Sequence, residues 1–91
     1  MTDKLNISDE WFYEAREGQE RQRRYDTVAS NYKSLEVLYG LLERRKDALV
    51  RRQMDQKNYE SASWAYLQAD LNGQIKQVTE LMNLLKFVQE A

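Results

Sequence analysis

Three features of the amino-acid sequence predict an all-α fold, built on a long antiparallel coiled-coil helical hairpin. The chain of 91 residues contains no proline. Apolar side chains recur every three or four residues along two long stretches, as they do in coiled coils. The two stretches mirror each other about a point near residue 56. Folding the chain at that point places these residues opposite each other: Leu49 and Trp64, Leu42 and Leu71, Leu35 and Val78, Tyr32 and Leu81, Val28 and Leu85, Tyr25 and Val88.

The N-terminal segment predicts a short helix over about 9–17. Ser8 is a suitable N-cap, and the acidic residues that follow it lie in the favourable first turn. This helix carries three successive aromatic residues, Trp11, Phe12 and Tyr13. Gly18 is the natural break after it, although its neighbours are good helix formers and a continuous helix is the alternative.

The first helix of the hairpin is predicted over about 19–55. Its heptad pattern holds for nearly four repeats, and three tyrosines occupy successive a positions, where their hydroxyl groups need polar partners. The a positions are Tyr25, Tyr32, Tyr39 and Lys46, and the d positions are Val28, Leu35, Leu42 and Leu49.

The second helix is predicted over about 59–89, with Asn58 as its N-cap. Ile75 and Met82 widen its apolar face. The turn before it contains neither glycine nor proline, so a domain-swapped dimer with one continuous helix remains open. The predicted seam comprises Trp64, Leu67, Leu71, Gln74, Val78, Leu81, Leu85 and Val88.

Two glycines, Gly40 and Gly73, fall inside the predicted helices and are related by the same mirror. A glycine inside a helix costs about 1 kcal/mol relative to alanine. Their shared level favours a close approach of the two backbones. The alternative is that both lie on exposed faces.

Several apolar residues lie off the predicted seam and indicate a second interface. A helix that is apolar on all sides is buried on all sides. We expect an interface with another subunit or a partner protein, with Trp11, Phe12, Leu38 and Leu41 as the main anchors. The alternative is that the N-terminal segment folds back and covers this surface within one chain. The predicted interface residues are Trp11, Phe12, Tyr13, Val37, Leu38, Leu41, Tyr66 and Phe87.

Basic residues form a stripe along one outer side of the first helix. Such a stripe is typical of contact with an acidic partner or with nucleic-acid phosphates. The alternative is a solvated face with local ion pairs, because the net charge is only −1 and the sequence pI is about 5.5. The residues of this stripe are Arg23, Arg24, Arg44, Arg45, Arg51 and Arg52.

Composition argues against catalysis and metal binding. The chain has no cysteine and no histidine, which removes thiolate nucleophiles, imidazole acid–base chemistry and nitrogen or sulfur ligands for zinc. No glycine-rich phosphate loop or paired carboxylates at a recognisable spacing are present. We therefore predict no enzyme activity, no cofactor and no metal. No segment is apolar enough to span a bilayer, which predicts a cytoplasmic protein without membrane contact.

The segment from Tyr59 to Ala69, with Trp64 at its centre, resembles the C-terminal helices of small helical-hairpin proteins encoded by bacteriophages. Apolar residues at Ile75, Val78, Leu81 and Leu85 continue the resemblance. It implies a virion, assembly or host-takeover accessory protein, located in the host cytoplasm or the virion. It covers about a third of the chain and assigns no role to any residue.

Together these features predict one helical domain, 1–91, with an N-terminal arm at 1–18 and a hairpin at 19–90. The predicted function is a non-catalytic interaction or assembly protein that self-associates and docks on a protein partner. The alternative is a small oligomeric nucleic-acid-binding or recombination accessory protein that uses the arginine stripe.

Overall fold

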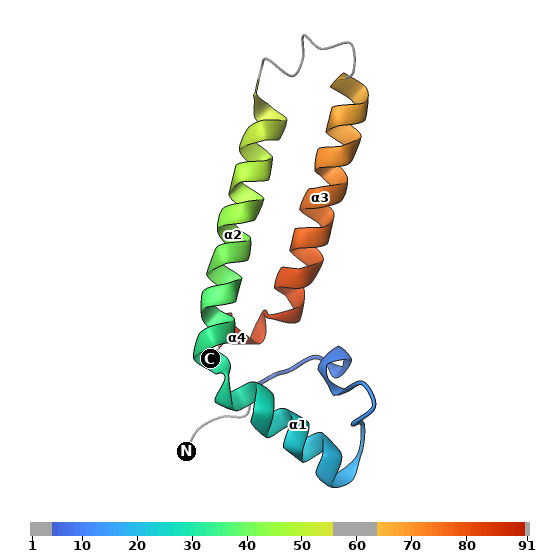
Figure 1. Ribbon diagram of the computed structural model, residues 1–91, viewed down its shortest axis with the longest axis vertical. Helices are drawn as coiled ribbons and strands as arrows, with labels where there is room; N and C mark the ends of the chain where they lie inside the picture. The colour runs from blue at the N-terminus through green and yellow to red at the C-terminus, as the bar shows by residue number, and fades with distance from the viewer. Residues whose placement is uncertain (1–4, 56–63, 91) are drawn as a thin grey trace.

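The computed structural model describes residues 5–55 and 64–90, and two antiparallel helices dominate it (Figure 1). The all-helical prediction is confirmed for these residues, and the two longest helices pack along each other. In chain order the elements are the 3₁₀ helix η1 (Asp9–Phe12), α1 (Gly18–Ser30), α2 (Tyr32–Met54), α3 (Trp64–Leu84) and α4 (Phe87–Glu90).

The core between α2 and α3 consists of residues that the heptad pattern predicts. Leu49 of α2 and Leu71 and Val78 of α3 are buried, and Leu71 has no exposed surface. Burial of one leucine or valine side chain stabilises a protein by about 1.5–3 kcal/mol. Half-buried apolar side chains surround this cluster: Leu42, Leu67, Ile75 and Met82.

The face that α3 turns toward α2 differs from the predicted seam. Leu81 is 49% exposed and Gln74 is exposed, whereas Ile75 and Met82 pack against the buried core. The prediction that Gln74 and Leu81 belong to the seam is therefore wrong. The rotation has a physical reason, because it spares the amide of Gln74 from burial without a partner and places Ile75 in its position.

The pairing of the two helices is displaced by one heptad from the predicted register. The Tyr32 hydroxyl donates a 2.8 Å hydrogen bond to the carbonyl of Val88, seven residues beyond the predicted partner Leu81. At the other end of the hairpin, the Gln68 side chain donates a 3.1 Å bond to the carbonyl of Gln53, which gives a similar displacement.

Polar positions in the seam explain the displacement. The predicted register sets Lys46 opposite Leu67 and Tyr39 opposite Gln74, so two layers each contain a polar mismatch. A shift of one heptad brings Lys46 level with Gln74, whose side chain is exposed, so Lys46 no longer lies opposite the apolar Leu67. Polar residues at core positions select the register of coiled coils in this way.

The single helix predicted over 19–55 is broken at Asn31, where α1 turns away from the direction of α2 (Figure 1). Asn31 has φ −101° and ψ 15°. Polar side chains at the break bond to the carbonyl of Thr27: Asn31 Nδ2 at 2.7 Å and Ser30 Oγ at 3.0 Å. Such side-chain bonds compete with the helical backbone pattern.

A second buried cluster lies where α1, α4 and the N-terminal arm meet. The described second helix ends at Leu84, and α4 then packs against α2, so α1 does not run alongside α3. Val28 and Tyr25 therefore pack in one cluster with the arm and with Phe87 and Val88 of α4. The buried members of this cluster are Ile7, Phe12, Val28, Phe87 and Val88.

The helix predicted over 9–17 is only the single turn of η1. The Ser8 side chain forms no capping hydrogen bond. The backbone carbonyl of Ser8 instead accepts a 3.1 Å hydrogen bond from the Trp11 N–H. The chain then passes through Glu14, at φ 57°, to Gly18, at φ 63°. The predicted break at Gly18 is confirmed, and the alternative of a continuous helix is wrong.

The second predicted helix also differs at its ends. The turn at Leu85 and Lys86 interrupts it before 89, because their N–H groups bond three residues back instead of four. The start predicted at 59 and the Asn58 cap lie outside the described residues.

The two mid-helix glycines do not bring the backbones together. A Cβ atom added at Gly40 or at Gly73 would meet nothing within 4 Å. The predicted close approach is therefore wrong, and the displaced register also removes their shared level.

Replacing Leu71 with alanine should lower the free energy of unfolding by about 2–5 kcal/mol, because it leaves a cavity in the hairpin core. Leu81→Ala is the matched control and should cost about 0.5 kcal/mol or less, since that side chain is half exposed. Urea unfolding at high dilution, followed by circular dichroism, measures both. Equal costs would restore Leu81 to the seam.

Replacing Gly40 or Gly73 with alanine should raise the free energy of unfolding by about 1 kcal/mol each, because the helix gains propensity and the new methyl groups meet open space. Gly18→Ala should lower it by about 1 kcal/mol, because the positive φ disfavours a side chain. Thermal unfolding compares the three variants. Destabilisation by Gly40→Ala would show that its surroundings are occupied.

Candidate interaction surface

The hairpin is a single layer of helices. The principal dimensions of the whole chain, with α1 and the arm, are 57 × 26 × 15 Å, and its radius of gyration is 17.7 Å. A compact domain of this length has a radius of gyration of about 12 Å. The accessible surface is 7367 Å², whereas a folded monomer of this mass exposes about 5,600 Å². The broad faces of α2 and α3 therefore have no further layer of the described chain over them.

A groove runs between α2 and α3 on one of these faces. Its volume is about 420 Å³, and its floor is formed by the core residues Leu49 and Val78. Its rims are formed by Arg45, Ala48 and Arg52 of α2 and by Gln74, Gln77 and Leu81 of α3.

Exposed apolar side chains continue this surface along both helices. Leu38 and Leu41 lie one heptad before Arg45 and Ala48, so they occupy the same side of α2, and they are 42% and 57% exposed. Tyr66 lies three turns before Gln77 on α3 and is 82% exposed. We call this surface the groove face: Leu38, Leu41, Arg45, Ala48 and Arg52 of α2, with Tyr66, Gln74, Gln77 and Leu81 of α3.

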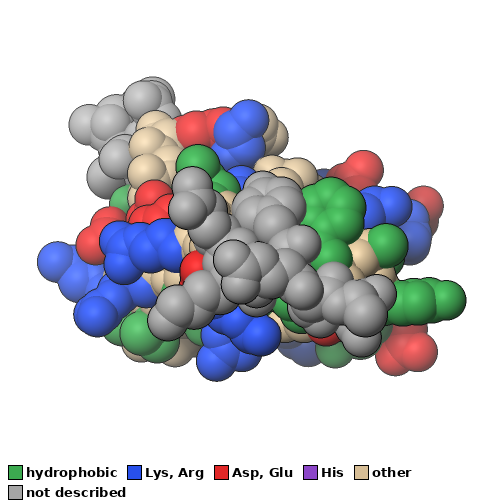
Figure 2. All heavy atoms as spheres, turned by 90° about the horizontal axis from the view of Figure 1, so that it is seen from above, with side chains coloured by type: hydrophobic (Ala, Val, Ile, Leu, Met, Phe, Trp, Pro, Cys, Tyr) green, Lys and Arg blue, Asp and Glu red, His purple; other side chains and the backbone are tan. Residues whose placement is uncertain are grey.

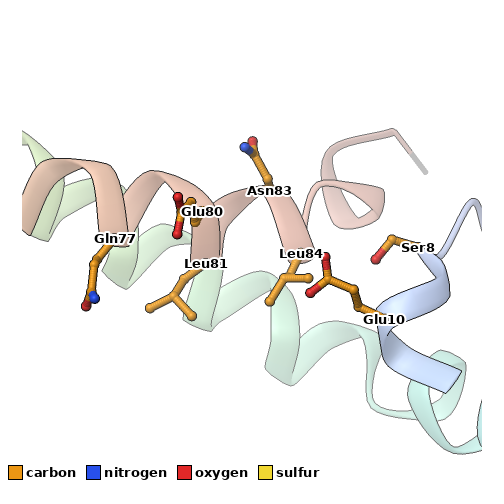
Figure 3. Close-up of a pocket in the computed structure, with 7 residues that line it drawn as sticks. All are labelled: Ser8, Glu10, Gln77, Glu80, Leu81, Asn83 and Leu84. Atoms are coloured by element: carbon orange, nitrogen blue, oxygen red, sulfur yellow. The ribbon is translucent and has the colours of Figure 1, made fainter. Parts of the chain in front are cut away.

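An acidic cleft adjoins the groove face at the end near the arm. Figure 3 shows Gln77, Leu81 and Leu84 pointing to one side of α3, with Glu10 of η1 beside Leu84. The cleft has a volume of about 590 Å³. Gln77 and Leu81 line both the groove and the cleft, which makes the two continuous. The lining is completed by Ser8, Glu80 and Asn83.

The predicted interface residues fall into two separate groups. Leu38, Leu41 and Tyr66 lie on the groove face, and Val37 is exposed at its edge. The sequence pattern missed Leu81, because it placed that residue in the seam. Trp11, Phe12 and Phe87 instead pack within the chain, and Tyr13 is exposed on the arm.

The described part of the N-terminal arm, residues 5–17, folds back on the end of the hairpin. The Trp11 indole N–H donates a 2.6 Å bond to the carbonyl of Leu84, and its ring meets Phe87 edge-on at 5.7 Å. Phe12 and Phe87 are each only 2% exposed. The alternative that the arm folds back is thus partly right, but the arm leaves the Val37–Leu41 surface open.

Two arginines of α1 hold the arm in place. Arg24 donates a 3.0 Å bond to the carbonyl of Trp11, and its guanidinium lies 4.5 Å from the centre of the Tyr13 ring. Arg21 lies 4.0 Å from the centre of the Phe12 ring and forms a 3.3 Å ion pair with Asp9. Cation–π contacts of this kind contribute about 0.5–2 kcal/mol. The signal in the sequence was a pair of arginines three residues apart after three aromatic residues.

The predicted arginine stripe is divided by the break at Asn31. Arg23 and Arg24 belong to α1, and Arg24 contacts the arm. Arg45 and Arg52 line the groove, while Arg44 and Arg51 lie farther out on α2. In the view onto the loop end, several basic side chains gather on the side of α2, with acidic side chains among them (Figure 2).

Comparisons with protein-family models, curated proteins and solved structures give no match. Among the described residues, no group of three acidic, histidine or cysteine side chains could hold a metal ion. No helix in this part of the chain is long and apolar enough to cross a bilayer.

Burial raises the pKa of the Tyr32 hydroxyl above its ordinary value of 10.0, and the negative charge of the nearby Glu36 carboxylate raises it further. The hydroxyl also donates the bond that holds Val88 at the end of the hairpin. The neutral phenol is therefore favoured in the folded protein.

This shift predicts a loss of stability at alkaline pH. The contribution of Tyr32 is fully present below pH 10 and is lost as the pH rises through the raised pKa. The free energy of unfolding of the parent should fall more steeply than that of Tyr32→Phe between about pH 9 and 11. Urea titrations of both proteins measure the two slopes. Parallel slopes would contradict the assignment.

Proposed function

We propose that the protein is a non-catalytic assembly protein, a coiled-coil hairpin that self-associates through the groove face and docks on a protein partner. The observation that carries this proposal is a row of large apolar side chains on the uncovered face of a single-layer hairpin. Leu38, Leu41 and Leu81 are between 42% and 57% exposed. Contiguous exposed apolar patches of this kind mark protein interaction sites.

The exposed area supports a second copy as one occupant. The chain exposes about 1,800 Å² more than a compact monomer of its mass. A standard protein interface buries about 800 Å² on each partner. The excess is therefore larger than the surface that one partner buries in a standard interface.

Charge supports an antiparallel arrangement of the two copies. Arg45 and Arg52 line the groove, while Glu10 and Glu80 line the cleft near the arm. Packing two groove faces in opposite directions brings the basic part of each copy toward the acidic part of the other. Such complementarity fixes the relative orientation of partners.

Nucleic-acid binding is less well supported by this arrangement. A phosphate backbone needs a continuous basic stripe. Arg24 contacts the arm, and α1 diverges from α2 at Asn31. The arginines therefore do not form one continuous row.

Light scattering with multi-angle detection tests self-association. The parent should have twice the chain mass of 10.9 kDa at low and at high salt. Leu41→Asp and Leu81→Asp should reduce the mass to that of a monomer, because each places a charge in an apolar contact. Asn72→Asp is the matched control, because that exposed residue lies nine residues before Leu81 and so on the opposite side of α3, and it should leave the dimer intact. A monomeric parent at high protein concentration would refute self-association.

A further inference from the structure

The heptads of this chain fit two registers that differ by seven residues. In the observed register Tyr32 lies level with Val88. In the other register, which folds the chain near residue 56, Tyr25 meets Val88 and Val28 meets Leu85. In the structure the arm and α4 together cover Val28 and Tyr25, the two residues of α1 that the second register would place along the second helix.

The arm contacts the second helix at the carbonyl of Leu84, where α3 ends. In a continuous α-helix this carbonyl would accept the N–H of Val88, four residues on. In the structure the Val88 N–H donates instead to the carbonyl of Leu85. The Trp11 indole N–H donates a 2.6 Å hydrogen bond to the carbonyl of Leu84. The docked arm thus stabilises the turn that separates α3 from α4.

The break between α1 and α2 is confined to one residue. Asn31 has φ −101° and ψ 15°, which is near the helical region, and the Leu35 N–H still donates a 3.1 Å bond to its carbonyl. Rotation at this single residue would join α1 and α2 into the long helix that the heptads predict.

The arm joins α1 through a strained connection. Glu14 has φ 57°, a left-handed conformation that disfavours residues with a Cβ atom. The contacts of the arm with the hairpin come mainly from Trp11 and Phe12, and Arg21 and Arg24 hold it against α1. Release of the arm would break these contacts and relieve the strain at Glu14.

We propose that the N-terminal arm controls the register of the hairpin. With the arm docked, α2 and α3 pair as observed. When a protein partner takes up Trp11 and Phe12, α1 joins α2, α3 joins α4, and the second helix slides by one heptad to cover Tyr25 and Val28. The partner shifts the equilibrium because it binds the arm only in the released state. This proposal is argued from the contacts of the arm and not from self-association through the groove face.

Disulfide trapping tests the register directly, because the natural chain contains no cysteine. The Gln53 amide donates a hydrogen bond to the side chain of Asn72, so Gln53→Cys with Asn72→Cys reports the observed register. If the second helix slides by one heptad, Ala65 moves to the position beside Gln53 that Asn72 had occupied. The pair Gln53→Cys and Ala65→Cys therefore reports the second register. Each pair is oxidised in the full chain, and intrachain disulfides are identified by mass spectrometry.

With the natural arm, the pair at 53 and 72 should form a disulfide and the pair at 53 and 65 should not. Adding Trp11→Ala and Phe12→Ala should reverse this preference, while helical content rises or stays constant. Tyr66→Ala is the matched aromatic control and should leave the first pair dominant. The proposal fails if the pair at 53 and 72 dominates without the arm contacts. It also fails if these variants unfold, because the second register would then have no stability of its own.

Discussion

The position of α3 along α2 determines the rest of this structure. Once the Tyr32 hydroxyl holds the carbonyl of Val88, α3 ends before it reaches Tyr25 and Val28 of α1, and only the short α4 and the arm remain to cover them. Apolar side chains on an overhanging helix must be covered by another element. The N-terminal arm provides that cover, and α1 bends at Asn31 to meet it. The register of the hairpin, the bend and the arm are thus parts of one packing solution.

The arm and the groove face divide the apolar residues of the chain between two uses. Trp11, Phe12 and Phe87 complete the core at the end of the hairpin, where they are shielded from water. Leu38, Leu41 and Leu81 have no such cover within the described chain. Because a two-helix hairpin has no third layer, its long faces stay exposed within the described chain, whereas its end is closed by a short segment of that chain.

Heptad periodicity correctly predicted an all-helical chain in which two long helices pack along each other, but not the break at Asn31 or the turn after Leu84. It could not fix the register, because a slide of seven residues preserves every a and d position. Only the few polar residues of the seam distinguish the two pairings, and their effect depends on which side α3 turns toward α2. The position of the arm was harder to predict from the sequence than the register. Its contacts join residues such as Trp11 and Leu84, which lie far apart in the sequence.

The two proposed equilibria share residues and must influence each other. Leu81 and Gln77 line both the groove and the cleft beside the arm. Sliding α3 by one heptad would carry Leu81 away from Arg45 and Ala48 and remove the groove face in its present form. A second copy bound to that face therefore favours the docked arm. By linkage, a partner that takes the arm must weaken self-association by the same factor. The chain would then exchange one protein interface for another instead of using both together.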